Sequence, residues 1–178
     1  TALKSAMDDW TQLTGRPYDL IEQYRMEDAE YALVGMAGMM ETAMATADFL
    51  RDRGKKVGVV HVTCFRPFPG IELVDALQNV KAFSVLERMD NPIAQSNPLT
   101  AEIKSAFADA MIGSVGYPRI DDIPVIYSGS AGLGSRDVDE SPLPSKESGR
   151  GESLPSFIHI SVTDWPKTSL SSHNLYLL

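Results

Sequence analysis

YALVGMAGMMETAMATADFLRDRGKKVGVVHVTCFRPFPG, residues 31–70, is the stretch that decides the fold. Residues 31–34 are a short apolar run that ends at Gly35 and Gly38, the pattern of a buried strand entering a turn. Apolar side chains then recur at helical spacing as far as Leu50, and Gly54 follows as a stop signal. Residues 57–62 are mostly valine and predict a second buried strand. Two strands joined by a helix are expected to lie parallel, with the helix on one face.

The rest of the chain continues this alternation of strands and helices. Residues 18–24 are strand-like, and the next segment is too short for a parallel crossover, so this strand should be antiparallel and at an edge. Residues 73–77 predict a helix and residues 82–86 a strand. Asn97 and Pro98 have the N-cap and first-position pattern of a helix that ends at Gly113. Further predicted elements are an N-terminal helix with an apolar face from Leu3 to Leu13 and a strand over residues 123–127.

Composition limits the size of the protein and the classes of partner. A chain of 178 residues that is 43% hydrophobic can form one substantial core but hardly two. Its net charge of −8 argues against a nucleic-acid or anionic-membrane partner, because both require clustered cations. No run approaches the roughly 20 apolar residues that span a bilayer, and no secretory leader is visible, so we expect a cytoplasmic protein. Cys64 is the single cysteine and cannot form an internal disulfide or a thiolate-bound cluster.

The chain divides into three parts by character. Residues 1–15 read as the last helix of a preceding domain, and residues 16–138 as the α/β domain. Residues 139–178 read as a Ser/Pro-rich linker followed by an unassigned tail. Within the tail, residues 141–156 carry too few apolar side chains to offset their ordering entropy, so a flexible linker is expected there.

A binding surface is expected where the loops that follow the parallel strands converge. The candidates for an interface or site edge are Gly35, Gly38, Arg66, Glu87, Arg88 and Asp90. No complete catalytic constellation and no metal-ligand set emerges from them, so no catalytic or metal-binding residue is assigned.

Each candidate has a second interpretation. The two glycines could cradle a phosphate at a helix N-terminus, but they lack dinucleotide-site spacing, so a tight turn is favoured. Arg66 could bind an anion or pair with Glu87. Glu87, Arg88 and Asp90 could form an acid–base cluster, but a salt-bridged docking patch is favoured.

Two other residue types invite a functional interpretation that the pattern does not favour. His61 lies in a predicted buried strand, where a hydrogen-bonded core histidine is favoured over a catalytic base. The helix methionines are favoured as core filler over a cofactor site; they are Met36, Met39, Met40 and Met44.

Three motifs together resemble one family. They are the quoted stretch, VLERMDNPIAQSNPLTAEIKSAF at residues 85–107, and VIYSGSAGLGSRD at residues 125–137. In this order they resemble the transketolase C-terminal-like domain of the alpha subunit of pyruvate:ferredoxin and 2-oxoacid:ferredoxin oxidoreductases. The resemblance covers roughly residues 2–138, and the chain departs from the family beyond them. It implies an α/β fold, a three-layer α/β/α sandwich with a five-strand mixed, mostly parallel sheet whose first strand is antiparallel.

The resemblance also implies a host enzyme that oxidatively decarboxylates a 2-oxoacid such as pyruvate to an acyl-CoA. That enzyme would use thiamine diphosphate, Mg²⁺, iron–sulfur clusters and coenzyme A, and would pass electrons to ferredoxin or flavodoxin. In the family the thiamine site lies between other domains and the clusters lie in cysteine-rich segments, so no cofactor is expected to be bound by this chain. Its expected partners are the other domains or subunits of the oxidoreductase.

Two hypotheses follow from these observations. In the first, the chain is the C-terminal domain of an oxidoreductase subunit that supports thiamine-dependent oxidation and is inactive by itself. In the second, it is a free-standing, non-catalytic α/β domain that binds a nucleotide or a protein.

Overall fold

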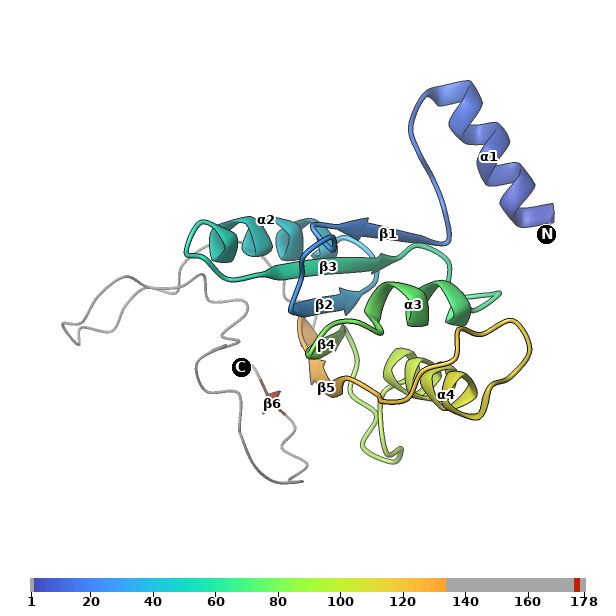
Figure 1. The fold of residues 1–178 in the computed structure, drawn as a ribbon. Helices are drawn as coiled ribbons and strands as arrows, with labels where there is room; N and C mark the ends of the chain where they lie inside the picture. The colour runs from blue at the N-terminus through green and yellow to red at the C-terminus, as the bar shows by residue number, and fades with distance from the viewer. Residues whose placement is uncertain (1, 134–174, 177–178) are drawn as a thin grey trace.

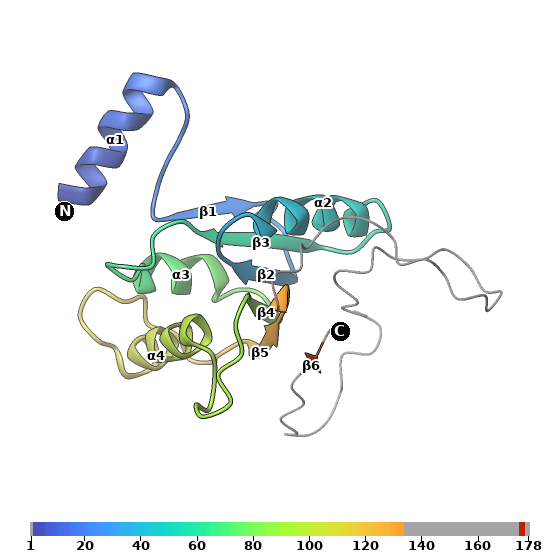
Figure 2. The ribbon, with the colours of Figure 1, turned by 180° about the vertical axis from the view of Figure 1, so that it is seen from behind.

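The computed structural model describes residues 2–133 and 175–176 of the 178-residue chain. Its helices are α1 (Ala2–Thr14), α2 (Met39–Arg51), α3 (Gly70–Leu77) and α4 (Pro98–Ile112). Its strands are β1 (Ile21–Tyr24), β2 (Tyr31–Gly35), β3 (Val57–Val62), β4 (Ala82–Glu87), β5 (Val125–Ser130) and β6 (Leu175–Tyr176). Figures 1 and 2 show α2 on one side of the sheet and α3 and α4 on the other.

The sheet has the order β1-β3-β2-β4-β5-β6. β1 pairs antiparallel with β3, and β2, β3, β4 and β5 pair in parallel. The predicted five-strand mixed sheet with an antiparallel first strand is therefore confirmed. β6, which pairs in parallel with the end of β5, was not predicted, because its segment has no strand periodicity.

Strand alternation divides the core between the two faces of the sheet. Val34, Val60 and Phe83 point into the larger cluster, which α3 and α4 cover. Their strand neighbours Leu33 and Val59 point into a smaller cluster beneath α2. In the larger cluster the rings of Phe83 and Phe107 stack with centroids 5.7 Å apart. Successive side chains of a strand point to opposite faces, so one sequence run supplies both cores.

The helices form where their patterns predicted them. The stripe on α4 from Leu99 to Ala110 is buried, and Gly113 ends the helix in the left-handed conformation with φ 75°. The methionines of α2 fill the core, the interpretation that the sequence favoured over a cofactor site. Met39 and Met40 are buried, and Met44 packs against the same cluster. α1 differs from the others. Only Met7 of its apolar face is buried, while Trp10 and Leu13 are 54% and 82% exposed.

One predicted boundary was wrong, and another falls outside the described residues. The last strand runs over residues 125–130 and not 123–127, because the first residues of the glycine-rich segment continue the ladder with β4 as far as Ser130. Apart from residues 175–176, the predicted linker and tail at 139–178 lie outside the described residues. The division of the chain into three parts stays a prediction.

Candidate functional site

The carboxyl ends of β2, β3, β4 and β5 meet at one edge of the sheet, which we call the carboxyl edge. It comprises the loops at residues 36–38, 63–69, 88–97 and 131–133. From β2 the chain crosses to β3 on one side, and from β3 it returns to β4 on the other side of β2. The carboxyl ends of β2 and β4 thus flank the topological switch point of an open α/β sheet. The sequence-predicted candidates lie on three of these loops or at the ends of the strands before them.

Gly35 is explained by packing. A Cβ there would lie 2.8 Å from the Met40 sulfur and 3.0 Å from the Leu86 carbonyl oxygen, so only glycine fits between β4 and α2. Gly38 has open space around it and a φ of −60°, and the left-handed residue of this turn is Ala37, with φ 64°. These contacts support the tight-turn interpretation of Gly35 and place Gly38 at the exposed start of α2.

Arg66 does not pair with Glu87. Its guanidinium donates to the Glu102 carboxylate of α4 at 2.6 Å and lies over the Phe65 ring. The Arg66 side chain is 58% exposed, so the pair contributes little to the free energy of folding. The sequence could not identify Glu102 as the partner of Arg66, because the two residues are far apart in the chain and meet only when α4 packs in the tertiary structure.

Glu87 is the main correction to the predicted site edge. As part of a site edge, its side chain was expected to reach solvent or a partner, but the residue is only 8% exposed and its carboxylate binds α4 of the same chain. Its carboxylate accepts hydrogen bonds from the Leu99 and Thr100 amides at 2.8 and 3.1 Å, and from the Thr100 hydroxyl at 2.9 Å. Glu87 therefore satisfies the free N–H groups at the start of α4, where the helix dipole also favours a negative charge.

Asn97 consequently has a different role from the predicted one. It occupies the N-cap position of α4, but its side chain makes no capping hydrogen bond. Instead it binds the preceding loop, accepting from the Asn91 amide at 2.9 Å and donating to the Met89 carbonyl at 2.8 Å. Ser130 at the end of β5 joins this network, so β4, α4 and β5 are tied together at the carboxyl edge.

Arg88 and Asp90 are the candidates that lie at the switch point with exposed side chains. They follow directly from β4, whose six residues are all buried, so the strand fixes where they begin. Met89 between them is 40% exposed. The loop therefore presents one cation, one anion and apolar surface together, which is the composition of a protein-docking surface.

His61 is not a core residue. It lies on β3 opposite Glu22 of β1, with its Nδ1 atom 3.5 Å from the Glu22 carboxylate, and its side chain is partly exposed. Both residues belong to the sheet, His61 on β3 and Glu22 on β1. Their contact links the antiparallel edge strand to its neighbour and gives no catalytic arrangement.

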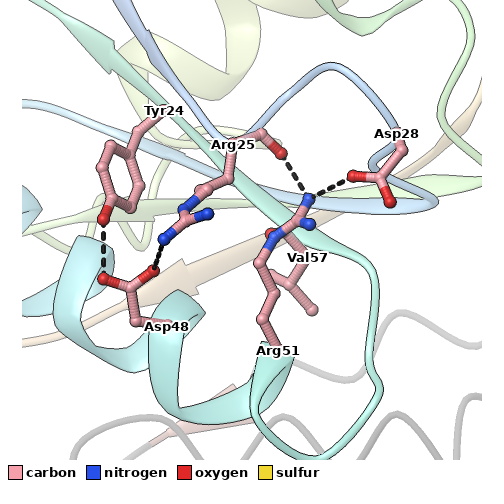
Figure 3. Close-up of polar contacts among 6 residues, drawn as sticks. All are labelled: Tyr24, Arg25, Asp28, Asp48, Arg51 and Val57. Atoms are coloured by element: carbon pink, nitrogen blue, oxygen red, sulfur yellow. Dashed lines mark hydrogen bonds and ion pairs between the residues drawn. The ribbon is translucent and has the colours of Figure 1, made fainter.

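The opposite end of the sheet, the amino edge, holds a second polar cluster that sequence reasoning missed (Figure 3). Tyr24 donates to Asp48 at 2.6 Å, and Arg25 forms an ion pair with Asp48 at 3.2 Å. Arg51 donates to the Arg25 carbonyl at 2.6 Å, to the Asp28 carboxylate at 2.8 Å and to the Val57 carbonyl at 2.7 Å. We call these side chains the amino-edge cluster; they are Tyr24, Arg25, Asp28, Asp48 and Arg51.

Charge pairing lowers the pKa of two carboxyl groups at the amino edge. The hydrogen bond from Arg51 holds the pKa of Asp28 below its ordinary value, and the bond from Lys81 does the same for Glu30. Glu30 in turn raises the pKa of Lys81. Both carboxylates are thus stabilised in their charged form, as expected for scaffolding ion pairs.

Two features of the described residues bear on the cofactors that the resemblance implies for the whole enzyme. Among residues 2–133 and 175–176, no three His, Cys, Asp or Glu side chains gather as a possible metal site. At Gly35, the space beside the backbone is filled by Met40 and Leu86, and so is not a cradle for a phosphate. We therefore derive no catalytic step from these residues. No helix in the described part of the chain is long and apolar enough to cross a membrane.

Comparison with known proteins places this geometry in context. Residues 29–121, just over half of the chain, match the family model described as pyruvate:ferredoxin oxidoreductase core domain II. The chain is 32% identical over 136 residues to pyruvate synthase subunit PorA of Methanothermobacter thermautotrophicus, covering 76% of the chain and 32% of that protein. It is 34% identical over 137 residues to pyruvate-flavodoxin oxidoreductase of Klebsiella pneumoniae, covering 76% of the chain and 11% of that protein.

Among solved structures, 2-oxoglutarate:ferredoxin oxidoreductase from Magnetococcus marinus aligns with 65% of the chain and 17% of its own, at 17% identity and a TM-score of 0.42. The chain spans about a third or less of the length of the two curated relatives described above.

Proposed function

Because the chain belongs to the pyruvate:ferredoxin oxidoreductase core domain II family, we propose that it is a supporting domain of a 2-oxoacid:ferredoxin oxidoreductase. The enzyme as a whole oxidatively decarboxylates a 2-oxoacid such as pyruvate to an acyl-CoA. Thiamine diphosphate with Mg²⁺, the iron–sulfur clusters and coenzyme A are held by its other domains. Ferredoxin or flavodoxin takes the electrons, and the enzyme works in the cytoplasm, where Cys64 stays reduced.

In this proposal the carboxyl edge is the surface that meets the rest of the enzyme. The observation that carries it is the contrast between Glu87, which is buried and binds the start of α4, and the exposed Arg88 and Asp90 that follow it. A buried strand and a helix cap hold this pair in place, as expected for a surface that must present a fixed pattern to a partner. α1 is proposed to meet the same neighbouring domain, since Trp10 and Leu13 lie exposed on its apolar face.

The alternative of a free-standing nucleotide-binding domain has less support. The family match does not favour it, and Gly35, which a phosphate cradle would use, is required by the packing of Met40.

The test is reconstitution with the remaining domains of the oxidoreductase from the same organism, expressed as a separate polypeptide, which we call the partner polypeptide. We expect the 178-residue chain to be inactive alone, to bind the partner polypeptide in size-exclusion chromatography, and to be required for 2-oxoacid oxidation. Stoichiometric iron in the isolated chain, or thiamine diphosphate binding at micromolar affinity by calorimetry, would contradict the proposal that the other domains hold the cofactors. Absence of binding between the two polypeptides would contradict the docking role.

A further inference from the structure

The loop between β4 and α4, residues 88–96, is anchored at Met89 and Asn91 by the buried side chain of Asn97 together with Ser130. Asn97, which is 6% exposed, uses both ends of its amide. Its oxygen accepts from the Asn91 amide, and its nitrogen donates to the Met89 carbonyl and to the Ser130 hydroxyl at 3.1 Å. Ser130 also donates to the Met89 carbonyl at 2.8 Å. We call residues 88–96 the presenting loop.

These hydrogen bonds do not serve the helix that follows. The start of α4 is capped by the Glu87 carboxylate, and the Asn97 side chain makes no capping bond. The Asn97 side chain is buried and both ends of its amide are hydrogen-bonded, so it acts on the presenting loop and not on the helix. Fixing a loop lowers the entropy lost when that loop binds a partner.

The presenting loop carries apolar side chains into solvent next to its two anchored residues, Met89 and Asn91. Ile93 is 95% exposed and Met89 is 40% exposed. Arg88 and Asp90, one cation and one anion, lie exposed on either side of Met89. An apolar centre with a polar rim of both signs is the arrangement found at protein interfaces. A phosphate-bearing ligand would instead require an excess of cations, which residues 88–96 do not have.

We propose that the presenting loop is a preformed recognition element that inserts Ile93 into an apolar hollow on a neighbouring protein surface. Asn97 is the positioning residue that holds the loop ready for this contact. Arg88 and Asp90 form the rim, so the partner should offer an acidic group to the first and a basic group to the second. The inference deepens the proposed docking role of the carboxyl edge and rests on it.

Ile93→Ser tests the insertion, with Ile112→Ser as the matched control. Ile112 is 78% exposed at the last position of α4, which places it about 20 Å from the start of that helix. We expect Ile93→Ser to raise the Kd for the partner polypeptide about tenfold or more, and Ile112→Ser to leave it within about twofold. Both variants should melt at the temperature of the unsubstituted chain. Equal Kd values for the two variants would overturn the inference.

This result is distinguishable from failure of the docking proposal itself. If Arg88→Glu weakens binding while Ile93→Ser does not, the carboxyl edge docks but Ile93 is not its anchor. If the unsubstituted chain does not bind the partner polypeptide at all, both proposals are contradicted.

Asn97→Ala tests the positioning role separately from helix capping. We expect faster hydrogen exchange across residues 88–96, unchanged exchange across α4 because Glu87 remains, and a Kd raised several-fold. The variant Asn97→Asp keeps the oxygen that accepts from Asn91 but not the donors, and should lie between alanine and asparagine. Faster exchange in the loop with an unchanged Kd would overturn the proposal that preorganisation serves recognition. Loss of protection throughout α4 would instead make Asn97 a residue that stabilises the helix.

Discussion

The two edges of the sheet use their charged side chains differently. At the amino edge, charged side chains from three elements bind one another. At the carboxyl edge, the buried carboxylate of Glu87 binds a helix, and the exposed charges of Arg88 and Asp90 lie on a loop. Arg51 links α2 to the β1–β2 loop and to β3 through three hydrogen bonds. Glu87 caps α4, while Arg88 and Asp90 extend beyond the strand. Similar residue types therefore serve two purposes, which can be told apart by burial and by partners but not by composition.

The comparison predicts that substitutions at the amino edge act mainly on stability. Arg51→Ala should lower the free energy of unfolding by about 2–3 kcal/mol, because the carbonyl groups of Arg25 and Val57 and the Asp28 carboxylate lose their donor. Urea unfolding followed by circular dichroism measures this change. Arg53→Ala is the control, because Arg53 lies exposed on the neighbouring turn and its contacts with the Phe49 carbonyl and ring stay within one turn of α2, so the change should cost less than about 1 kcal/mol. Equal losses for the two arginines would remove the distinction between scaffold and surface.

Glu87→Gln should have the next largest effect on stability. The amide keeps one acceptor but points an N–H group at the donors of Leu99 and Thr100, so we expect a loss of about 1–2 kcal/mol. The exposed Glu102, which pairs with Arg66, is the control, and Glu102→Gln should cost less than about 1 kcal/mol. Once folded, Glu87→Gln should bind the partner polypeptide as the unsubstituted chain does. A stable variant that fails to bind would place Glu87 among the docking residues.

The fold was largely predictable because its signals are local. Strand, helix and stop patterns in residues 31–62 predict a parallel unit, and the short β1–β2 connection predicts an antiparallel edge strand. The last strand was misplaced because Ser128, Gly129 and Ser130 have a loop composition, yet their backbone groups continue the ladder with β4. Glycine and serine weaken a strand but do not prevent it when a neighbour supplies the pairing.

The candidate site was predictable by position but not by role. Loops that follow parallel strands meet at one edge, so the sequence could place Arg88 and Asp90 on a loop of the carboxyl edge. Their role as a site edge stays a prediction. The burial of Glu87 could have been suspected from alternation, since Phe83 and Val85 point toward α4 and residue 87 follows at the same spacing. The partners of Arg51, Arg66 and Asn97 could not, because hydrogen bonds between distant segments depend on the packed tertiary structure.

Acid that neutralises the Asp28 and Glu30 carboxylates at the amino edge is expected to lower stability by less than the substitutions at Arg51 and Glu87. The lowered pKa values of Asp28 and Glu30 mean that their stabilising contribution is present above the ordinary carboxyl range. It is lost as the pH falls below about 4 toward those lowered values. Carboxyl NMR titration should show both groups ionising below the ordinary range, and Asp28→Asn with Glu30→Gln should flatten the fall in melting temperature on acidification. Ordinary titration of both carboxyl groups would show that these pairs do not hold in solution.

The most direct test of the docking role is charge reversal at Arg88, where the smallest change in stability should accompany a large loss of binding. We expect Arg88→Glu to leave the melting temperature of the isolated chain almost unchanged, because an exposed ion pair contributes only about 0–1 kcal/mol. Its Kd for the partner polypeptide should rise by an amount corresponding to about 2–5 kcal/mol, as expected for a charge desolvated at an interface. Arg53→Glu makes the same charge change at the amino edge and should leave binding intact. If Arg88→Glu unfolds the chain while binding per folded molecule is unaffected, its charge is scaffolding and the carboxyl edge is not the docking surface.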